Sequence, residues 1–314
     1  MKKRNLIFVP LAVCLAACTT ARNAVLLSSY EITLADSSPE DTTVTDVTAM
    51  TDSRGEQARI LSAFFGLDNG LPSAANRGVC RGVCRGAGGK DGMPVIFSHE
   101  IDIASMQAGD FKVTSASGKV GEITCVTLAP ADDGGELRTA LLAGEYGSID
   151  DQPARVEIVG NLLSIDRSVN FKGASITPIA LEAGPTIILA ELSPEDQAEL
   201  GKQPTPLPWG GGSGCPVGTA QVVNVTWVGG VTKSGGRDAD DVERQQYRVT
   251  VQQADGSEAE VAPRALADLN DGDNNHRLCL DVDGTPKAVF FPAGFLTDPR
   301  DDPNPDTSMP ISER

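Results

Sequence analysis

Pro94-Val95-Ile96-Phe97 begins a series of short apolar and β-branched segments that sets the fold class of this chain. Turn residues separate these segments at the spacing that is typical of a β-sandwich. Only 4% of the residues are aromatic, whereas 33 are glycine and 20 are proline, and this mix favours short strands over long helices. We therefore predict an all-β fold. The expected strands of the first block are residues 94–97, 110–114, 122–128, 137–142, 155–159 and 168–172.

A second strand-rich block, residues 220–308, repeats the order of the first. A repeat of roughly 90 to 100 residues with matched strand order predicts two tandem copies of one β-sandwich. Three pairs of segments correspond: Pro94–Phe97 with Val222–Val225, Phe111–Thr114 with Tyr247–Thr250, and residues 154–163 with residues 287–296.

The first block also resembles a known family. Val95-Ile96-Phe97-Ser98-His99-Glu100-Ile101-Asp102, followed by Phe111-Lys112-Val113-Thr114, is similar to the opening of S-layer-type bacterial immunoglobulin-like domains. Those domains begin with an apolar strand, Phe-Ser, an acidic residue, an apolar residue and Asp, and continue to a Phe-x-Val strand. The resemblance implies two immunoglobulin-like sandwiches with a spacer or adhesive role, and it transfers no catalytic residue.

The N-terminus has the pattern of an export signal. Lys2, Lys3 and Arg4 precede a short apolar run that ends at Leu15, and this run is too short to span a bilayer as a mature helix. Leu15-Ala16-Ala17-Cys18 resembles the lipobox of bacterial lipoproteins, which implies that residues 1–17 are removed and that Cys18 carries a diacylglycerol. An ordinary signal peptide with an incidental cysteine is the alternative. Thr19 after the cysteine resembles outer-membrane sorting, with the side of the membrane left open.

The charge limits the partners of this chain. The formal net charge is −17 at pH 7. Removal of residues 1–17 takes away three basic residues and makes it about −20. Such a chain repels nucleic acid and anionic lipid head groups, so membrane attachment has to come from the lipid. Other envelope or surface macromolecules remain as partners.

The chain divides into a signal, a tether and two sandwiches. Ser53 to Glu56 has capping-box spacing, and Ile60, Leu61, Phe64 and Phe65 recur at helical intervals, which predicts a short amphipathic helix. A Pro- and Gly-rich stretch predicts the linker between the sandwiches. The expected organisation is a signal peptide (1–17), a flexible tether (18–52), a short helix and loop packing on the first domain (53–92), sandwich 1 (93–190), a linker (191–214), and sandwich 2 with a C-terminal tail (215–314).

An exported chain lies in an oxidising compartment, so its cysteines are expected to pair. Cys215 and Cys279 both lie in the second block, and we predict a disulfide between them. Cys125 would pair with Cys80 or with Cys84.

Candidate sites are few. Only His99 and His276 are present, and no Gly-x-Ser-x-Gly motif occurs, so we assign no catalytic residue. Asp268, Asp271 and Asp273 form the candidate calcium loop, because calcium takes several oxygen ligands from one acidic turn. Asp281 or Asp283 on the following strand would assist. A solvated acidic turn is the alternative interpretation, and no other cofactor is expected. A second acidic loop, Asp301 to Asp306, alternates Asp302, Asn304 and Asp306.

These observations favour a lipid-anchored envelope protein with a non-enzymatic structural or adhesive role. A lipoprotein hydrolase is a second hypothesis, and it would bring the carboxylates of the candidate calcium loop and His276 into one pocket. A ligand-binding envelope lipoprotein is a third, and it would hold an apolar cavity between the sandwiches.

Overall fold

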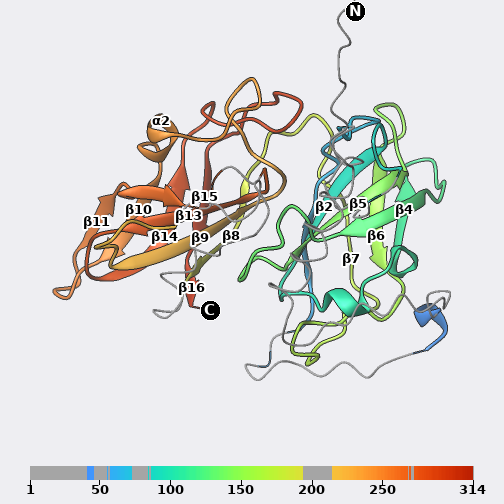
Figure 1. Cartoon of the computed structure of the whole chain (residues 1–314), viewed down its shortest axis with the longest axis horizontal. Helices are drawn as coiled ribbons and strands as arrows, with labels where there is room; N and C mark the ends of the chain where they lie inside the picture. The colour runs from blue at the N-terminus through green and yellow to red at the C-terminus, as the bar shows by residue number, and fades with distance from the viewer. Residues whose placement is uncertain are drawn as a thin grey trace, which may run out of the picture.

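A computed structural model describes residues 41–45, 55, 57–72, 84, 86–193, 214–267, 269 and 272–313. These residues form four β-sheets in two groups, which we call the first module (residues 57–181) and the second module (residues 187–313) (Figure 1). The described part contains a single α-helix, α2 (Asp241–Arg244), so the mostly β fold expected from the sequence is present. Within the same residues, no helix has the length and apolar character to cross a bilayer.

The first module contains seven strands in two antiparallel sheets. A four-stranded sheet has the order β1-β2-β5-β4, and a three-stranded sheet has the order β3-β6-β7. Two short 3-10 helices, η3 (Ile103–Ser105) and η4 (Ala108–Asp110), lie between β2 and β3. The strands are β1 (Ile60–Ala63), β2 (Asp91–Phe97), β3 (Phe111–Ser115), β4 (Glu122–Thr127), β5 (Thr139–Glu145), β6 (Pro153–Ile158) and β7 (Ser175–Ile176).

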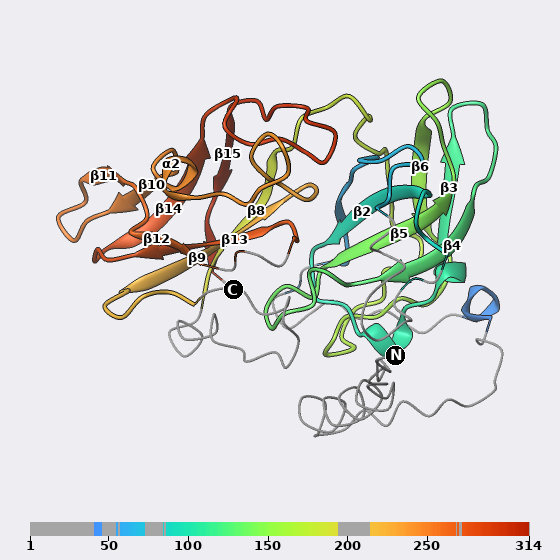
Figure 2. The same ribbon diagram turned by 45° about the horizontal axis from the view of Figure 1, so that its top comes forward.

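The second module repeats this topology (Figure 2). The order β8-β9-β13-β12 corresponds to β1-β2-β5-β4, and β10-β14-β15 corresponds to β3-β6-β7. Two strands are additional: β11 pairs with β10, and the C-terminal β16 pairs with β8 in parallel. The strands are β8 (Ile187–Leu192), β9 (Gln221–Trp227), β10 (Arg248–Gln252), β11 (Glu258–Val261), β12 (Ala265–Ala267), β13 (Asn275–Leu280), β14 (Thr285–Phe291), β15 (Thr307–Pro310) and β16 (Ser312–Glu313).

The repeat extends to the residue register. Val113 is paired with Val156 in the first module, and Val249 is paired with Val289 in the second. The register then shifts after Thr114 and after Thr250, and in each case the next pair contains a proline, Pro153 or Pro286. Proline has no backbone N–H to donate, so it is tolerated at such an irregularity. The segment correspondence predicted from the sequence therefore holds residue by residue along these strands.

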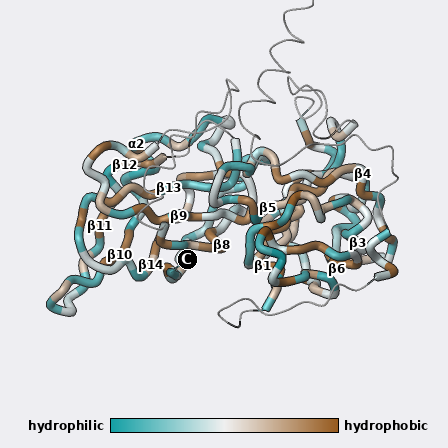
Figure 3. The backbone as a smooth tube through the Cα atoms, turned by 60° about the horizontal axis from the view of Figure 1, so that its bottom comes forward, coloured by the Kyte–Doolittle hydropathy of each residue, from teal (hydrophilic) through white to brown (hydrophobic). Residues whose placement is uncertain are grey.

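Each module has its own apolar core between its two sheets. In the first, Val95 of β2 and Leu142 of β5 meet Val113 of β3 and Val156 of β6. In the second, the core includes Trp227 and Phe291 with valines of β9 and β10. Hydrophilic residues gather in turns such as the β10–β11 hairpin, as the hydropathy colouring shows (Figure 3).

The predicted N-terminal helix is wrong where the structure describes it. Ile60–Ala63 is a strand, β1, and it pairs antiparallel with β2. The residues looked helical because the segment is buried on more than one side: Phe65 lies in the first core, whereas Phe64 lies outside both cores. A strand buried on both faces does not alternate, so periodicity alone does not distinguish it from a helix.

The predicted boundary between the modules also needs correction. Residues 187–192, expected to end sandwich 1 and begin the linker, form β8 in the second module, where β8 pairs with β9. The Pro- and Gly-rich segment therefore lies between two strands of one sheet. The link between the modules is residues 182–186.

The expected flexible tether, residues 18–52, is described only at residues 41–45. These residues do not remain free: Thr42–Val44 forms a 3-10 helix, η1, that is held against the first module. The rest of the tether and the signal peptide lie outside the described residues.

Candidate functional site

The two modules meet where the β4–β5 loop of the first lies against an outward sheet face of the second (Figures 1 and 2). Glu191, Asn224 and Arg277 form a row across β8, β9 and β13. Val223 and Val225 point into the second core, so strand alternation turns this row outward, toward the first module. We call this contact region the junction.

Arg277 forms the most buried ion pair of the junction. Its Nη2 lies 2.9 Å from Glu136 Oε1, and the two side chains are 5% and 4% exposed. The same nitrogen donates to the Gly134 carbonyl at 3.1 Å. A charge buried this deeply requires a partner, because desolvating it alone costs several kcal/mol.

A second pair crosses the junction in the opposite sense. Arg138 of the first module lies 3.0 Å from Glu191 of the second, again with little exposure of either side chain. Arg138 also donates to the Ser98 carbonyl at 3.0 Å. Each module therefore contributes one cation and one anion, and the four charges sum to zero.

Neutral contacts accompany the ion pairs. Asn274 Nδ2 donates to the Trp227 carbonyl at 2.7 Å and lies 3.3 Å from Thr139 Oγ1 of the first module. Phe64 is 1% exposed, and a Cβ on Gly229 would come within 2.7 Å of its ring. Glycine is thus required at position 229 for the backbone to approach the ring.

The link between the modules is short and closely packed. Leu181 belongs to the first core and Ile187 to the second, so only residues 182–186 lie between them. A Cβ on Gly184 would lie 1.8 Å from the Pro303 carbonyl oxygen, which shows direct contact of the link with the second module. This contact adds to the two ion pairs that join the modules.

The junction explains an irregular burial pattern. All six residues of β13 are buried, although strand alternation would leave one side exposed. Leu278 and Leu280 face the core, whereas Arg277 faces the first module and Cys279 is bonded to Cys215. Sequence reasoning missed the junction. The sequence feature that indicates the junction is Arg277, a charged residue within a strand of mostly apolar residues.

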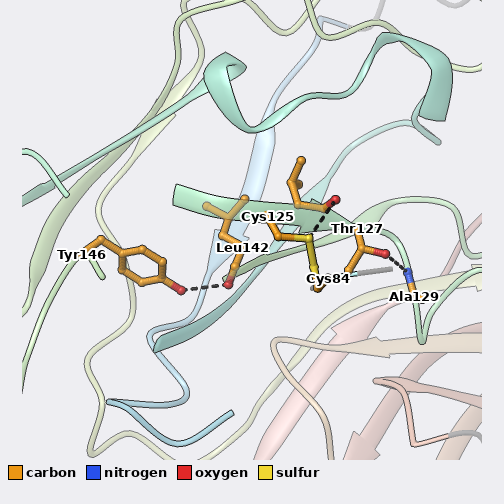
Figure 4. Close-up of a disulfide and its surroundings, with 7 residues drawn as sticks. Cys84, Cys125, Thr127, Ala129, Leu142 and Tyr146 are labelled. Atoms are coloured by element: carbon orange, nitrogen blue, oxygen red, sulfur yellow. Dashed lines mark hydrogen bonds between the residues drawn. A yellow bond between two sulfur atoms is a disulfide. The ribbon is translucent and has the colours of Figure 1, made fainter. Parts of the chain in front are cut away.

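Two disulfides are present in the described residues. Cys215 is joined to Cys279 with a Cα–Cα distance of 5.7 Å, the same pair that the sequence analysis selects. Cys84 is joined to Cys125 with a Cα–Cα distance of 5.6 Å (Figure 4). Cys80 lies outside the described residues. Disulfides of this kind persist in oxidising compartments, which agrees with export of the chain.

His276 is buried in the second module, on the same side of β13 as the core residues Leu278 and Leu280. Its Nδ1 is 2.8 Å from the Tyr247 hydroxyl, which accepts from Trp227 Nε1 at 3.1 Å. Burial raises the pKa of Tyr247 far above its ordinary value. The hydroxyl can accept from the indole and donate to the imidazole, so Trp227, Tyr247 and His276 form a buried hydrogen-bonded trio.

His99 occupies a partly exposed position after β2. Its Nδ1 lies 2.9 Å from Ser98 Oγ, and the same hydroxyl accepts from the Arg59 backbone N–H at 3.0 Å. The ring also packs edge-on against Phe171.

The candidate calcium loop is described only in part, because Asp268 and Asp271 lie outside the described residues. Asp273 is buried, and its carboxylate accepts from the backbone N–H and the side-chain amide of Asn275, both at 2.8 Å. Among the described residues, no group of three or more His, Cys, Asp or Glu side chains is arranged to hold a metal ion. Calcium binding by Asp268, Asp271 and Asp273 stays a prediction.

The second acidic loop uses its polar groups internally. Asn304 Oδ1 accepts from the N–H groups of Phe295 and Leu296 at 3.1 and 2.9 Å. Asp306 accepts from Ala293 N–H at 2.8 Å, and Asp298 accepts from Arg300 and Asp302. Alternating Asp and Asn residues here shape a turn.

Comparisons with known proteins give little further guidance. No protein-family model and no curated protein matches the sequence. A solved structure of the N-terminal part of the bacterial S-layer protein SbsC aligns with 11% identity and a TM-score of 0.28, over 82% of this chain and 45% of that chain. The S-layer protein rSbsC(31-844) aligns with 11% identity and a TM-score of 0.27, over 83% and 42%. This chain therefore spans less than half of either structure, and likeness at this level does not establish a shared fold or role.

Proposed function

We propose that this chain is a lipid-anchored envelope protein in which two immunoglobulin-like sandwiches act as one rigid structural or interaction unit. The immunoglobulin-like assignment rests on strand order. Named A to G along the chain, β1 to β7 give sheets A-B-E-D and C-F-G, which is the constant-type order. The second module has the same order with β11 and β16 added.

The junction is the observation that carries the proposal. Relative motion is the default for two domains joined by a linker, so contacts that restrict it need to be identified. Here the link has five residues, the Arg277–Glu136 pair is buried, and the Arg138–Glu191 pair is largely buried. Rigidity of this kind suits a spacer or a scaffold that holds a partner-binding surface at a fixed distance.

Anchoring is the second part of the proposal. Cys18 would carry the lipid, and export to an oxidising compartment agrees with the two disulfides. The outer membrane is the proposed location, on the basis of Thr19, and other envelope macromolecules are the proposed partners.

Two measurements test these parts separately. Cys18→Ser should move the protein from the membrane fraction to the soluble fraction after a high-salt wash, and a variant that still sediments with membranes would contradict the anchor. Small-angle scattering on the soluble variant should then fit one rigid particle. Adding Arg277→Ala should broaden the distribution of distances, whereas Val217→Ser, at a 91% exposed position of the same module, should leave it unchanged. A broad distribution before any junction change would contradict the rigid unit.

A further inference from the structure

A polar site on the first module holds residues 41–45 of the same chain. Its base is Asp110, which is fully buried at the end of η4. The Thr42 hydroxyl donates to one carboxylate oxygen of Asp110, and Gln107 donates to the same carboxylate through its backbone and its side chain. From the sequence alone, this part of the chain is expected to be only a flexible tether.

Asn161 forms the wall of the site. Its backbone N–H donates to Thr42 Oγ1 at 3.1 Å, and its side-chain amide donates to the Thr45 carbonyl at 3.0 Å. Asn170 donates to Asn161 Oδ1 at 2.9 Å and so fixes the direction of the amide. A Cβ on Gly160 would lie 1.9 Å from the Asp110 carboxylate, so only glycine permits this arrangement.

Lys172 holds the far end of the segment. Its Nζ lies 3.0 Å from the Thr43 carbonyl and 2.6 Å from the Thr45 carbonyl. A cation at the C-terminal end of a helical turn satisfies the carbonyls that have no partner within the turn. Asp41 caps the other end by accepting from Thr43 N–H at 3.0 Å.

The recognition is polar throughout. Val44, the apolar side chain of the segment, is 76% exposed, so no large apolar group is buried on the site. Hydrogen bonds exchanged with water contribute little net free energy each. Occupation of the site is therefore expected to be reversible, and loss of one central hydroxyl should be enough to shift it.

We propose that the site formed by Asp110, Asn161 and Lys172 is a receptor for residues 41–45, and that its occupation sets the reach of the lipid anchor. This inference rests on the proposed lipidation of Cys18. With the segment bound, residues 19–40 connect the anchor to the module, and a chain of that length spans at most about 75 Å. With the segment released, residues 19–56 connect them, and the maximum rises to about 130 Å. The bound state keeps the rigid unit near the membrane, and the released state lets it extend away.

Thr42→Ala tests the receptor, with Val44→Ser as the matched control in the same turn. In the full-length Cys18→Ser chain, hydrogen exchange at the Asn161 amide should increase at least tenfold in Thr42→Ala and stay unchanged in Val44→Ser. Lys172→Met should increase exchange in the same direction. Equal exchange in all variants would overturn the receptor, and this readout does not depend on the lipid.

The reach is tested on the lipidated protein. Neutron reflectometry on a supported bilayer should find the protein layer extended farther from the membrane for Thr42→Ala than for Val44→Ser. If the two protein layers extend equally far from the membrane although exchange at the Asn161 amide differs, the segment binds its site but does not control the reach of the anchor. Failure of both proteins to bind the bilayer would overturn the anchor itself. A shift from dimer to monomer in Thr42→Ala, seen by light scattering, would show that the segment comes from a second copy and would overturn occupation within one chain.

Discussion

The two modules share a topology but cover the outward face of their larger sheet in different ways. In the first module, described residues of the β1–β2 connection cover this face: Leu71 and Ala87 pack on Ala143 of β5 beside the Cys84–Cys125 bridge. In the second, the face carries Arg277 and meets the neighbouring module. The sheet of the first module is covered by a loop of the same module, whereas the sheet of the second module is covered by the first module. The difference shows that a repeated fold can devote the same face to self-stabilisation or to assembly.

Loss of a disulfide should give the largest effect. In the chain-entropy model, removing a bridge with a sequence separation of 64 or of 41 costs about 4 kcal/mol in either case. Both cysteines of a bridge should be changed to serine in the same variant, Cys215 together with Cys279 or Cys84 together with Cys125. Neither variant then contains an unpaired thiol from the lost bridge. Urea unfolding followed by tryptophan fluorescence reports the second module, since Trp227 lies in its core and the first module has no tryptophan.

The two replacements distinguish independent modules from a coupled pair. If the modules unfold separately, only the Cys215/Cys279 replacement shifts the fluorescence transition. If the junction couples them, both replacements shift it. A loss below about 1 kcal/mol in each case would contradict a stabilising role for the bridges.

Breaking the junction should come next. Arg277→Met leaves the Glu136 carboxylate buried without its cross-module partner, which should lower the free energy of unfolding by about 3 kcal/mol. Arg237→Met, at an exposed position of the same module, is the control. Adding Glu136→Gln should recover part of the loss, because the unpaired charge is then removed. Urea unfolding measures all three variants, and an effect of Arg277→Met equal to that of Arg237→Met would show that the pair is not buried in solution.

The hydrogen-bonded trio provides a smaller contrast. Tyr247 corresponds to Phe111 in the repeat, and only Tyr247 has a hydroxyl to satisfy Trp227 and His276. Tyr247→Phe should destabilise the second module by about 2 kcal/mol, since two buried polar groups lose a partner. Phe111→Tyr should destabilise the first by about 1–3 kcal/mol, because it buries a hydroxyl in an apolar core. Thermal unfolding of both variants checks this, and a neutral Tyr247→Phe would contradict the bonded trio.

The sequence predicted local pairing better than the surfaces that the fold brings together. Val113 and Val249 lie in alternating segments with matched neighbours, so strand type and register followed from the repeat. Phe64 and Phe65 have helical spacing in the sequence, because a strand end that packs on a second module has no alternation. The Pro- and Gly-rich stretch has the composition of a linker, and composition does not distinguish a connection within a sheet from one between modules.

Charged positions were the hardest to predict. Glu136 precedes an expected strand, Arg138 lies near the start of that strand (137–142), and Glu191 is the first residue of the expected linker (191–214). A charged residue at any of these positions is, taken alone, typical of a solvated surface. Their burial follows from contact between modules, which depends on residues far apart in the sequence. Lys172 and Asn161 have the same property, since their partners at Thr43 and Thr45 are more than 100 residues away.

The smallest expected effect is a difference in acid response between two aspartates. Burial raises the pKa of Asp91 in the first module, against the opposing effect of three backbone N–H donors. Lys233 lowers the pKa of Asp240 in the second module to about 2. Asp91 binds its proton more readily folded than unfolded, so its contribution to stability falls as pH rises from 3.8 through its folded pKa. Asp240 acts in the opposite sense: its contribution is present above 3.8 and is lost as pH falls toward 2. Carboxyl NMR titration should give the two midpoints on opposite sides of 3.8, and Lys233→Met should move Asp240 upward while leaving Asp91 in place. Equal titration midpoints for Asp91 and Asp240 would contradict the predicted difference in acid response between the two modules.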